Sequence, residues 1–166
     1  MKMNEVASVA GNTRAQSASG YDLRPLSAAT RAELAKGLTG EERRVLLSQG
    51  TEPAFCGGLL DNKREGVYAC RLCGLPLFSS KAKFNSGTGW PSFFAPVDAA
   101  HVRDIEDRSY GMFRVENRCA RCDSHLGHVF EDGPKPTGLR YCMNSVSLQF
   151  FDDGVTPPQH VEPSAA

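Results

Sequence analysis

The sequence has no surplus of charge of either sign, because 19 Lys and Arg residues balance 19 Asp and Glu residues. Proteins that bind nucleic acid usually carry a basic surplus that neutralises phosphates, so this balance argues against that class without excluding a local basic patch. The sequence also lacks any apolar run long enough to cross a bilayer. We therefore expect neither a nucleic-acid partner nor a membrane-spanning segment.

The N-terminal region has few large apolar residues. Residues 1–6 lack the apolar core of a secretory signal. Residues 1–25 are rich in Ala, Ser, Gly and Asn, a composition typical of a flexible tail. Because free thiols and thiolate metal sites persist in reducing compartments, we expect a cytoplasmic protein, and we expect it to be a monomer.

The six cysteines fall into two groups, of which the larger forms two Cys-x-x-Cys pairs, Cys70/Cys73 and Cys119/Cys122. A tight turn within each pair aims both sulfurs at one ion, and zinc prefers four N or S ligands in a tetrahedron. We therefore predict one structural zinc ion with four cysteine ligands. The alternatives are two disulfides, a thioredoxin-like redox site, or a zinc site in which His125 or His128 replaces a cysteine.

The length of 166 residues and the hydrophobic fraction of 40% suit one domain. We predict that this domain spans residues 26–152, between the N-terminal tail and a C-terminal tail over 153–166. It should begin with a short helical segment over 30–50. Two capping-box patterns, Thr30-x-x-Glu33 and Thr39-x-x-Glu42, indicate helix starts within that segment.

From Cys56 onward, short apolar or β-branched runs alternate with Gly, Pro and Asp, and this pattern indicates short strands. The runs are Gly66-Val-Tyr-Ala, Phe113-Arg-Val-Glu, His128-Val-Phe and Ser145-Val-Ser-Leu-Gln-Phe-Phe. Period-two alternation in the last run predicts a half-buried strand that starts at Ser145. The fold class is therefore mainly β, with an antiparallel domain held together by zinc.

Four motifs follow one another in the second half of the chain. They are Gly87-Thr-Gly-Trp90-Pro-Ser, Asp107-x-Ser-x-Gly-Met112, Ser124-His125-Leu-Gly-His128-Val-Phe130 and Gly138-Leu-Arg140-Tyr-Cys142-Met-Asn144-Ser. Together they resemble the signatures of the B-type peptide methionine sulfoxide reductases, over about residues 38–151. The resemblance implies a catalytic β-tent domain of two packed antiparallel sheets, which reduces the R epimer of methionine sulfoxide in proteins and peptides. Thioredoxin is the usual reductant in that family.

The chemistry of the residues agrees with the resemblance. Sulfoxide reduction needs a soft nucleophile for sulfur, which Cys142 can supply as a thiolate. Arg140 lies two residues away, on the same face of a strand, where its charge would favour that thiolate. Asn144 shares this parity and is a candidate for binding substrate or orienting a histidine. The alternatives are an inert buried Cys142, a salt-bridged Arg140 and an Asn144 in a turn.

Histidine is the side chain best suited to deliver a proton near neutral pH. The resemblance implies that His125 and His128 lie beside the sulfoxide oxygen, where they would bind it and act as acids. The alternatives are a core role for His128 and a metal-ligand role for His125. His101 and His160 lack such context, and we expect both to be solvated.

The only tryptophan, Trp90, lies in a Gly-rich loop. The resemblance implies that its indole forms the wall against which the substrate methyl group packs, a contact that suits an aromatic face. Phe130 is predicted to line the same pocket. Core packing is the alternative for both residues.

Reduction leaves the cysteine as a sulfenic acid, which condenses with a second thiol. Many relatives carry that thiol two residues before the tryptophan, where this chain has Thr88. Four of the other cysteines are assigned to zinc, so we predict that Cys56 resolves the sulfenic acid. The two glycines after Cys56 would let the segment move. The alternative is a passive Cys56 and direct reduction of Cys142 by an external thiol.

Two other function classes remain open from the residues. A zinc-stabilised β-tent domain can serve as a non-catalytic binding module, but such a module needs no free nucleophile beside a cation and histidines. A nucleic-acid-binding zinc ribbon is the second, and the balanced charge argues against it.

Overall fold

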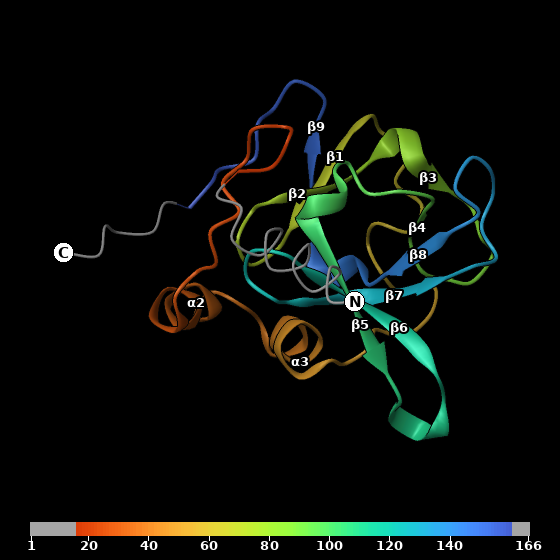
Figure 1. Ribbon diagram of the computed structural model, residues 1–166, viewed down its shortest axis with the longest axis horizontal. Helices are drawn as coiled ribbons and strands as arrows, with labels where there is room; N and C mark the ends of the chain where they lie inside the picture. Colours follow the sequence, from red (N-terminus) through yellow and green to blue (C-terminus); the bar gives the residue numbers. More distant parts are fainter. Residues whose placement is uncertain (1–15, 161–166) are drawn as a thin grey trace, which may run out of the picture.

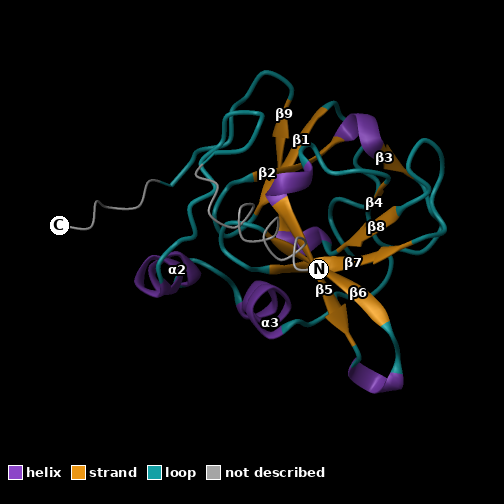
Figure 2. Cartoon of the chain, viewed as in Figure 1, coloured by secondary structure: helices purple, strands orange, loops and turns teal. Residues whose placement is uncertain are grey.

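The structure is a computed structural model, which describes residues 16–160. Residues 1–15 of the predicted N-terminal tail and residues 161–166 of the predicted C-terminal tail lie outside the described residues. Figures 1 and 2 show two short helices beside two β-sheets. No helix among the described residues is long and apolar enough to cross a membrane. The domain boundaries stay a prediction, and Leu23, at the end of the predicted tail, is buried in the core.

Two antiparallel sheets build the molecule, as predicted. The smaller sheet has the strand order β2 (Pro76–Ser79), β1 (Gly66–Cys70), β9 (Leu148–Asp152). The larger has the order β3 (Lys83–Phe84), β4 (Ser92–Phe93), β8 (Arg140–Met143), β7 (His125–Phe130), β6 (Arg114–Cys119), β5 (Val102–Asp107). Among the described residues, four 3-10 turns lie between strands. Two of them are on connections between the two sheets: η1 (Ser80–Ala82), from β2 to β3, and η4 (Ser145–Ser147), from β8 to β9. The other two, η2 (Ala99–His101) and η3 (Ser109–Gly111), lie between strands of the larger sheet.

Aromatic rings from both sheets form the core between them. Phe93 of the larger sheet stacks on Phe78 of the smaller one, with 4.6 Å between ring centroids. Tyr68 of β1 meets the same Phe93 edge-on at 5.0 Å. All three side chains are fully buried. Burial of such rings is a large share of the stabilisation available to a small domain, because each removes about 150–250 Å² from water.

The helical segment forms as predicted, but only one of its two predicted caps is correct. Helix α3 (Gly40–Ser48) begins with the Thr39 capping box, in which Thr39 and Glu42 each accept the other's backbone N–H. Helix α2 (Ala28–Ala35) begins before Thr30, because Ser27 is its N-cap and accepts the Thr30 N–H. Glu33 pairs with Lys36 instead of closing a box. Helix α3 packs against β7 and η4.

The strand predicted to start at Ser145 starts three residues later. Ser145–Ser147 forms the 3-10 turn η4, and β9 begins at Leu148. The turn is held by side chains distant in sequence: the Ser147 hydroxyl donates to the carbonyl of His125, and Glu52 accepts the N–H of Val146. Period-two alternation cannot reveal such partners, so it overstated the strand.

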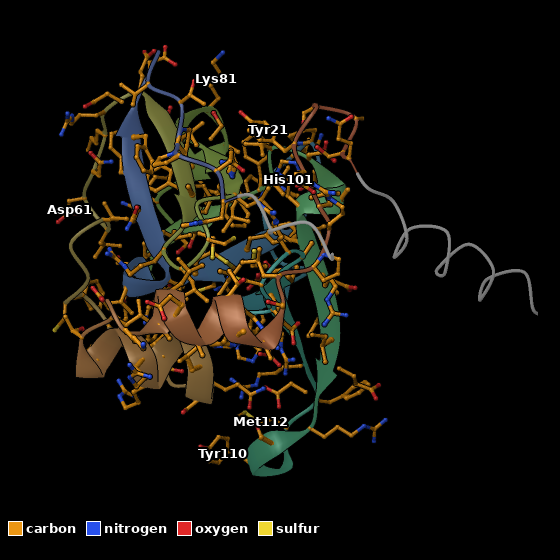
Figure 3. All side chains as sticks on the ribbon, turned by 90° about the vertical axis from the view of Figure 1, so that its left-hand side faces the viewer. Tyr21, Asp61, Lys81, His101, Tyr110 and Met112 are labelled. Atoms are coloured by element: carbon orange, nitrogen blue, oxygen red, sulfur yellow. The ribbon has the colours of Figure 1, made fainter. Side chains whose placement is uncertain are left out.

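The expectation of a solvated His101 is wrong, because its side chain is fully buried. One ring nitrogen, Nδ1, bonds to the carbonyl of Pro76, and Nε2 lies 2.8 Å from the Ser17 hydroxyl. Tyr21 packs edge-on against the ring. Figure 3 shows Tyr21 and His101 close together, where the segment that precedes α2 meets the β domain.

Candidate active site and metal centre

The four paired cysteines meet in one buried cluster. Their sulfurs all lie within 4.8 Å of one another. The Sγ atoms of Cys70 and Cys122 are 3.5 Å apart, and those of Cys73 and Cys119 are 3.6 Å apart. A disulfide needs about 2.05 Å, whereas zinc–sulfur bonds of about 2.3 Å place tetrahedral sulfurs roughly 3.8 Å apart. The cluster therefore fits a structural zinc ion and excludes the two-disulfide alternative.

Each cysteine pair sits on a tight turn that aims its sulfurs inward. Gly74 donates its N–H to the carbonyl of Cys70, and Asp123 donates to that of Cys119. Both turn residues have left-handed backbone angles, with φ of 83° at Gly74 and 66° at Asp123. Asp tolerates this conformation better than most non-glycine residues. No histidine belongs to the cluster.

A second feature is a small cavity of about 110 Å³ around Cys142, hereafter the Cys142 cavity. Cys142 of β8 and His128 of β7 are ladder partners, which places their side chains side by side on one face of the sheet. The remaining lining residues are Thr51, Trp90, Arg114, Gly127, Phe130, Met143 and Asn144. The structure thus gathers Cys142, His128, Trp90, Phe130 and Asn144 at one site.

The protonation of Cys142 is set by opposing effects. Burial raises the pKa of the Cys142 thiol, and hydrogen bonds from Thr88 and Arg140 together with the Arg140 charge act against that rise. Thr88 Oγ1 lies 3.8 Å from the sulfur. Thr88, two residues before Trp90, therefore touches the predicted nucleophile.

Arg140 is fixed on two sides. Its Nε and one terminal nitrogen donate to the Asp132 carboxylate at 2.9 and 3.0 Å. Its guanidinium lies over the Phe130 ring, 4.3 Å from the centroid. A bidentate pair with a carboxylate, together with stacking on a ring, leaves the group little freedom. Arg140 is consequently held where its charge acts on Cys142.

His128 has a carboxylate partner that sequence reasoning missed. Its Nε2 lies 2.7 Å from the Asp107 carboxylate, which also accepts bonds from Arg114 and the Ser109 N–H. Hydrogen bonding from His128, more than any other effect, holds the pKa of Asp107 well below its usual range. Because the carboxylate is charged, Nε2 must carry the proton, which leaves Nδ1 as the other reactive nitrogen. The motif that contains Asp107 was the only sequence signal for it.

His125 lies behind His128, outside the lining of the Cys142 cavity. The two rings are 5.6 Å apart between centroids. His125 is buried, and its Nδ1 lies 2.7 Å from the Glu116 carboxylate. Burial lowers the pKa of His125, although Glu116 partly opposes this. Its ring instead lines a neighbouring hollow of about 460 Å³ under α2 and α3.

Glu52, which no sequence pattern indicated, joins three parts of the site. Its carbonyl accepts the Trp90 indole N–H at 2.9 Å, and its N–H donates to the Asn144 side chain at 2.9 Å. Asn144 in turn donates to the carbonyl of Leu126 on β7. Trp90 and Asn144 are thereby fixed relative to each other by a segment that leads directly to Cys56.

Cys56 is exposed, in a loop beside the one that carries Thr88. The neighbouring Phe55 donates its N–H to the carbonyl of Gly89 at 2.7 Å. Phe55 has a left-handed φ of 66°, which is unfavourable for a bulky residue. Cys56 is thus one residue from a direct contact with the loop that touches Cys142.

Comparisons with known proteins agree with one another. A family model described as "SelR domain" matches residues 38–152. A Caulobacter vibrioides protein named peptide methionine sulfoxide reductase MsrB is 63% identical over 142 residues, which cover 86% of this chain and 89% of its own. A Xylella fastidiosa protein of that name is 57% identical, with coverage of 85% and 91%. One from Escherichia coli is 57% identical, with coverage of 72% and 88%.

Proposed function

The chain belongs to the SelR-domain family of peptide methionine sulfoxide reductases, and we propose that Cys142 is the nucleophile with which it reduces the R epimer of methionine sulfoxide in proteins and peptides. It is an oxidoreductase, as predicted from the four motifs. The single observation that carries the residue assignment is the pairing of Cys142 with His128 at a cavity bordered by Trp90.

Substrate recognition begins with the methyl group. The Trp90 indole and the Phe130 ring border the Cys142 cavity and offer apolar faces to a methyl group and sulfur. Asn144 and His128 border the same space and offer polar atoms to the sulfoxide oxygen. Because the polar and apolar groups are fixed relative to each other, they favour one configuration at the chiral sulfur.

The chemical step transfers one oxygen atom and two electrons. The Cys142 thiolate attacks the sulfoxide sulfur, the sulfur–oxygen bond of the substrate breaks, and the oxygen passes to the cysteine as a sulfenic acid. His128 supplies a proton to the oxygen as its charge develops, and its Asp107 partner stabilises the charged imidazolium. His125 acts from behind His128 as a support for that ring. Methionine then leaves.

The sulfenic acid is resolved by Cys56. The Cys56 thiol displaces the hydroxyl group from Cys142 as water and forms a disulfide, which thioredoxin reduces in the cytoplasm. The support is the placement of Phe55 against Gly89, next to Thr88. Zinc, bound by the four cysteines, supplies structural stability and takes no part in these steps. We propose that the protein acts as a monomer and binds neither nucleic acid nor a membrane.

An epimer-resolved turnover assay tests the activity. We expect consumption of the R epimer alone from a blocked methionine sulfoxide, and none by the Cys142→Ser variant. Consumption of only the S epimer would contradict the stereochemical assignment, and consumption of neither epimer would contradict the activity and favour a non-catalytic binding module.

Disulfide mapping tests the resolver. After one turnover without reductant, we expect a Cys142–Cys56 disulfide in the native chain. The Cys56→Ser variant should still release one methionine per chain but lose thioredoxin-driven recycling. If Cys56 stays free while Cys142 is oxidised, the resolver assignment is wrong and an external thiol reduces Cys142.

A further inference from the structure

The Cys142 cavity is too small for more than one side chain. Its volume of about 110 Å³ is small beside the roughly 300–1,000 Å³ of typical small-molecule pockets. A polypeptide that inserts its methionine sulfoxide side chain must therefore lie across the surface outside the cavity. Any preference for a polypeptide over a free amino acid has to arise from that surface.

The β5–β6 hairpin exposes an apolar tip beside this surface. Tyr110 is 89% exposed, Met112 45% and Phe113 71%. Figure 3 shows Tyr110 and Met112 at the free end of the hairpin, clear of the rest of the molecule. Large apolar side chains grouped on a protruding element commonly mark an interaction site.

The backbone at the tip turns through two successive left-handed residues, Tyr110 and Gly111. Tyr110 has φ 57° and ψ 27°, a left-handed conformation that non-glycine residues rarely adopt. Asp107 holds this turn by accepting the N–H of Ser109. Two successive left-handed residues suit the tight turn of a β-hairpin, and in this turn the Tyr110 ring is held out in solvent.

The hairpin continues the wall of the Cys142 cavity. Arg114, at the start of β6, lines the cavity, and its ladder partner Asp107 bonds His128. Met112 is extended and two residues before Arg114, so it points to the same sheet face as Arg114, about 7 Å further along. Phe113 has the opposite parity and points to the other face.

We propose that Tyr110 and Met112 form an exosite for polypeptide substrates, which binds bulky apolar side chains about two to four residues from the methionine sulfoxide. Met112 lies about 7 Å beyond Arg114 along the strand, and Tyr110 lies further out. An extended peptide rises about 3.3 Å per residue, so its residues two to four positions from the methionine sulfoxide would reach the tip. The proposal rests on the proposed function of the Cys142 cavity. It assigns this surface to an extended, apolar segment of oxidised protein.

The test compares kcat/KM for three substrates that share methionine-R-sulfoxide. These are the blocked amino acid, a peptide with Leu residues at the third position on both sides, and the same peptide with Gly there. Tyr110→Asn keeps a residue that tolerates left-handed angles, and Met112→Gln keeps the side-chain length. Phe113→Gln is the matched control, because it removes an apolar group whose exposure lies between those of Tyr110 and Met112 and which points to the opposite face.

We expect each tip variant to lower kcat/KM for the Leu peptide by about fivefold, mainly through KM, because a partly buried apolar contact is lost. The blocked amino acid and the Gly peptide should be turned over unchanged, as should all three substrates by Phe113→Gln. Equal losses on all substrates, or no loss on the Leu peptide, would overturn the exosite. A defect confined to thioredoxin-dependent recycling would also overturn it and would assign the tip to the reductant. Inactivity of the native chain toward all three substrates would instead refute the proposed function.

Discussion

At the residue scale, Cys142, the proposed nucleophile, has surroundings that favour its neutral form. Burial raises the pKa of its thiol, so at neutral pH the resting site keeps the proton on sulfur. The groups that oppose this rise in pKa are Thr88, Arg140 and Ser92, and of these only Arg140 carries charge. Because the thiolate is the form that reacts, we expect a thiol held in this way to be oxidised more slowly than an exposed cysteine with an ordinary pKa.

The first prediction concerns the pH dependence of Cys142 reactivity. Replacing Arg140 with Met should shift the alkylation of Cys142 by iodoacetamide to higher pH, because loss of the cation disfavours the thiolate. At any pH below the thiol pKa the rate should fall several-fold. The measurement is the alkylation rate against pH in a Cys56→Ser background, followed by mass spectrometry.

Two comparisons make this prediction specific to charge. Arg140→Lys keeps the cation but loses the bidentate pair with Asp132, so its pH profile should lie between those of the native protein and of Arg140→Met. Arg64→Met removes an exposed arginine whose partner is Asp152, and it should leave the profile unchanged. Native and Arg140→Met profiles that coincide would show that Arg140 acts on substrate alone.

What the sequence could predict at this scale was set by local spacing. The spacing within each cysteine pair is a local pattern, and the four sulfurs meet as that pattern requires. Cys142 and Asn144 both line the cavity, whereas Arg140 lies outside the lining and acts on Cys142 through its charge and a hydrogen bond. Asp107 and Glu52 are different, because their contacts with His128 and with Trp90 span 21 and 38 positions. No periodicity encodes such contacts, so these two residues emerge only from the fold.

At the element scale, the segment that carries Cys56 is held by hydrogen bonds at Glu52 and has free space around its backbone at Gly58. Glu52 binds Trp90, Asn144 and Val146 and is buried. A Cβ added at Gly57 would lie 2.2 Å from the Ser145 hydroxyl and 2.3 Å from a Glu52 carboxylate oxygen, whereas one at Gly58 would meet nothing within 4 Å. Of the two glycines expected to let the segment move, Gly57 is closely packed and Gly58 is free.

The second prediction uses this difference. Gly57→Ala should displace Glu52 or Ser145 and so disturb Trp90, lowering stability by roughly 1–3 kcal/mol and slowing both turnover and Cys142–Cys56 disulfide formation. Gly58→Ala is the matched control and should fold and react as the native chain does. Denaturant unfolding and single-turnover disulfide formation measure the two effects. A Gly58→Ala defect as large as that of Gly57→Ala would show that backbone mobility, not packing, governs the segment.

The elements themselves were predictable where their signals are local. Thr39 caps α3 as its pattern indicates, because the capping box is complete within four residues. At Thr30 an equally local pattern failed, because Ser27, three residues earlier, caps the helix by accepting the N–H of Thr30 and so places Thr30 inside the first turn. The start of β9 failed for a longer-range reason, because Glu52 and the carbonyl of His125 hold η4 in a turn.

At the scale of the whole molecule, the four-cysteine cluster connects the two sheets. Cys70 ends β1 of the smaller sheet, and Cys119 ends β6 of the larger one. Its neighbours Cys73 and Cys122 lie in the turns that follow. The same β6 begins with Arg114 at the Cys142 cavity and pairs with β7, which carries His128. A metal at this cluster therefore fixes the position of the catalytic sheet relative to the rest of the core.

The last prediction follows from this connection. The purified protein should contain one zinc ion per chain, and Cys119→Ser should lose it together with most of the stability, because structural zinc contributes on the order of 10 kcal/mol to small domains. Cys56→Ser and Cys142→Ser are matched controls that remove a thiol outside the cluster, and both should keep zinc and Tm. Metal content and thermal unfolding, followed through Trp90 fluorescence, measure both quantities. If Cys119→Ser retained the native Tm after zinc loss, the two sheets would be held by the Phe78–Phe93–Tyr68 core alone, and the metal would be dispensable for the geometry of the Cys142 cavity.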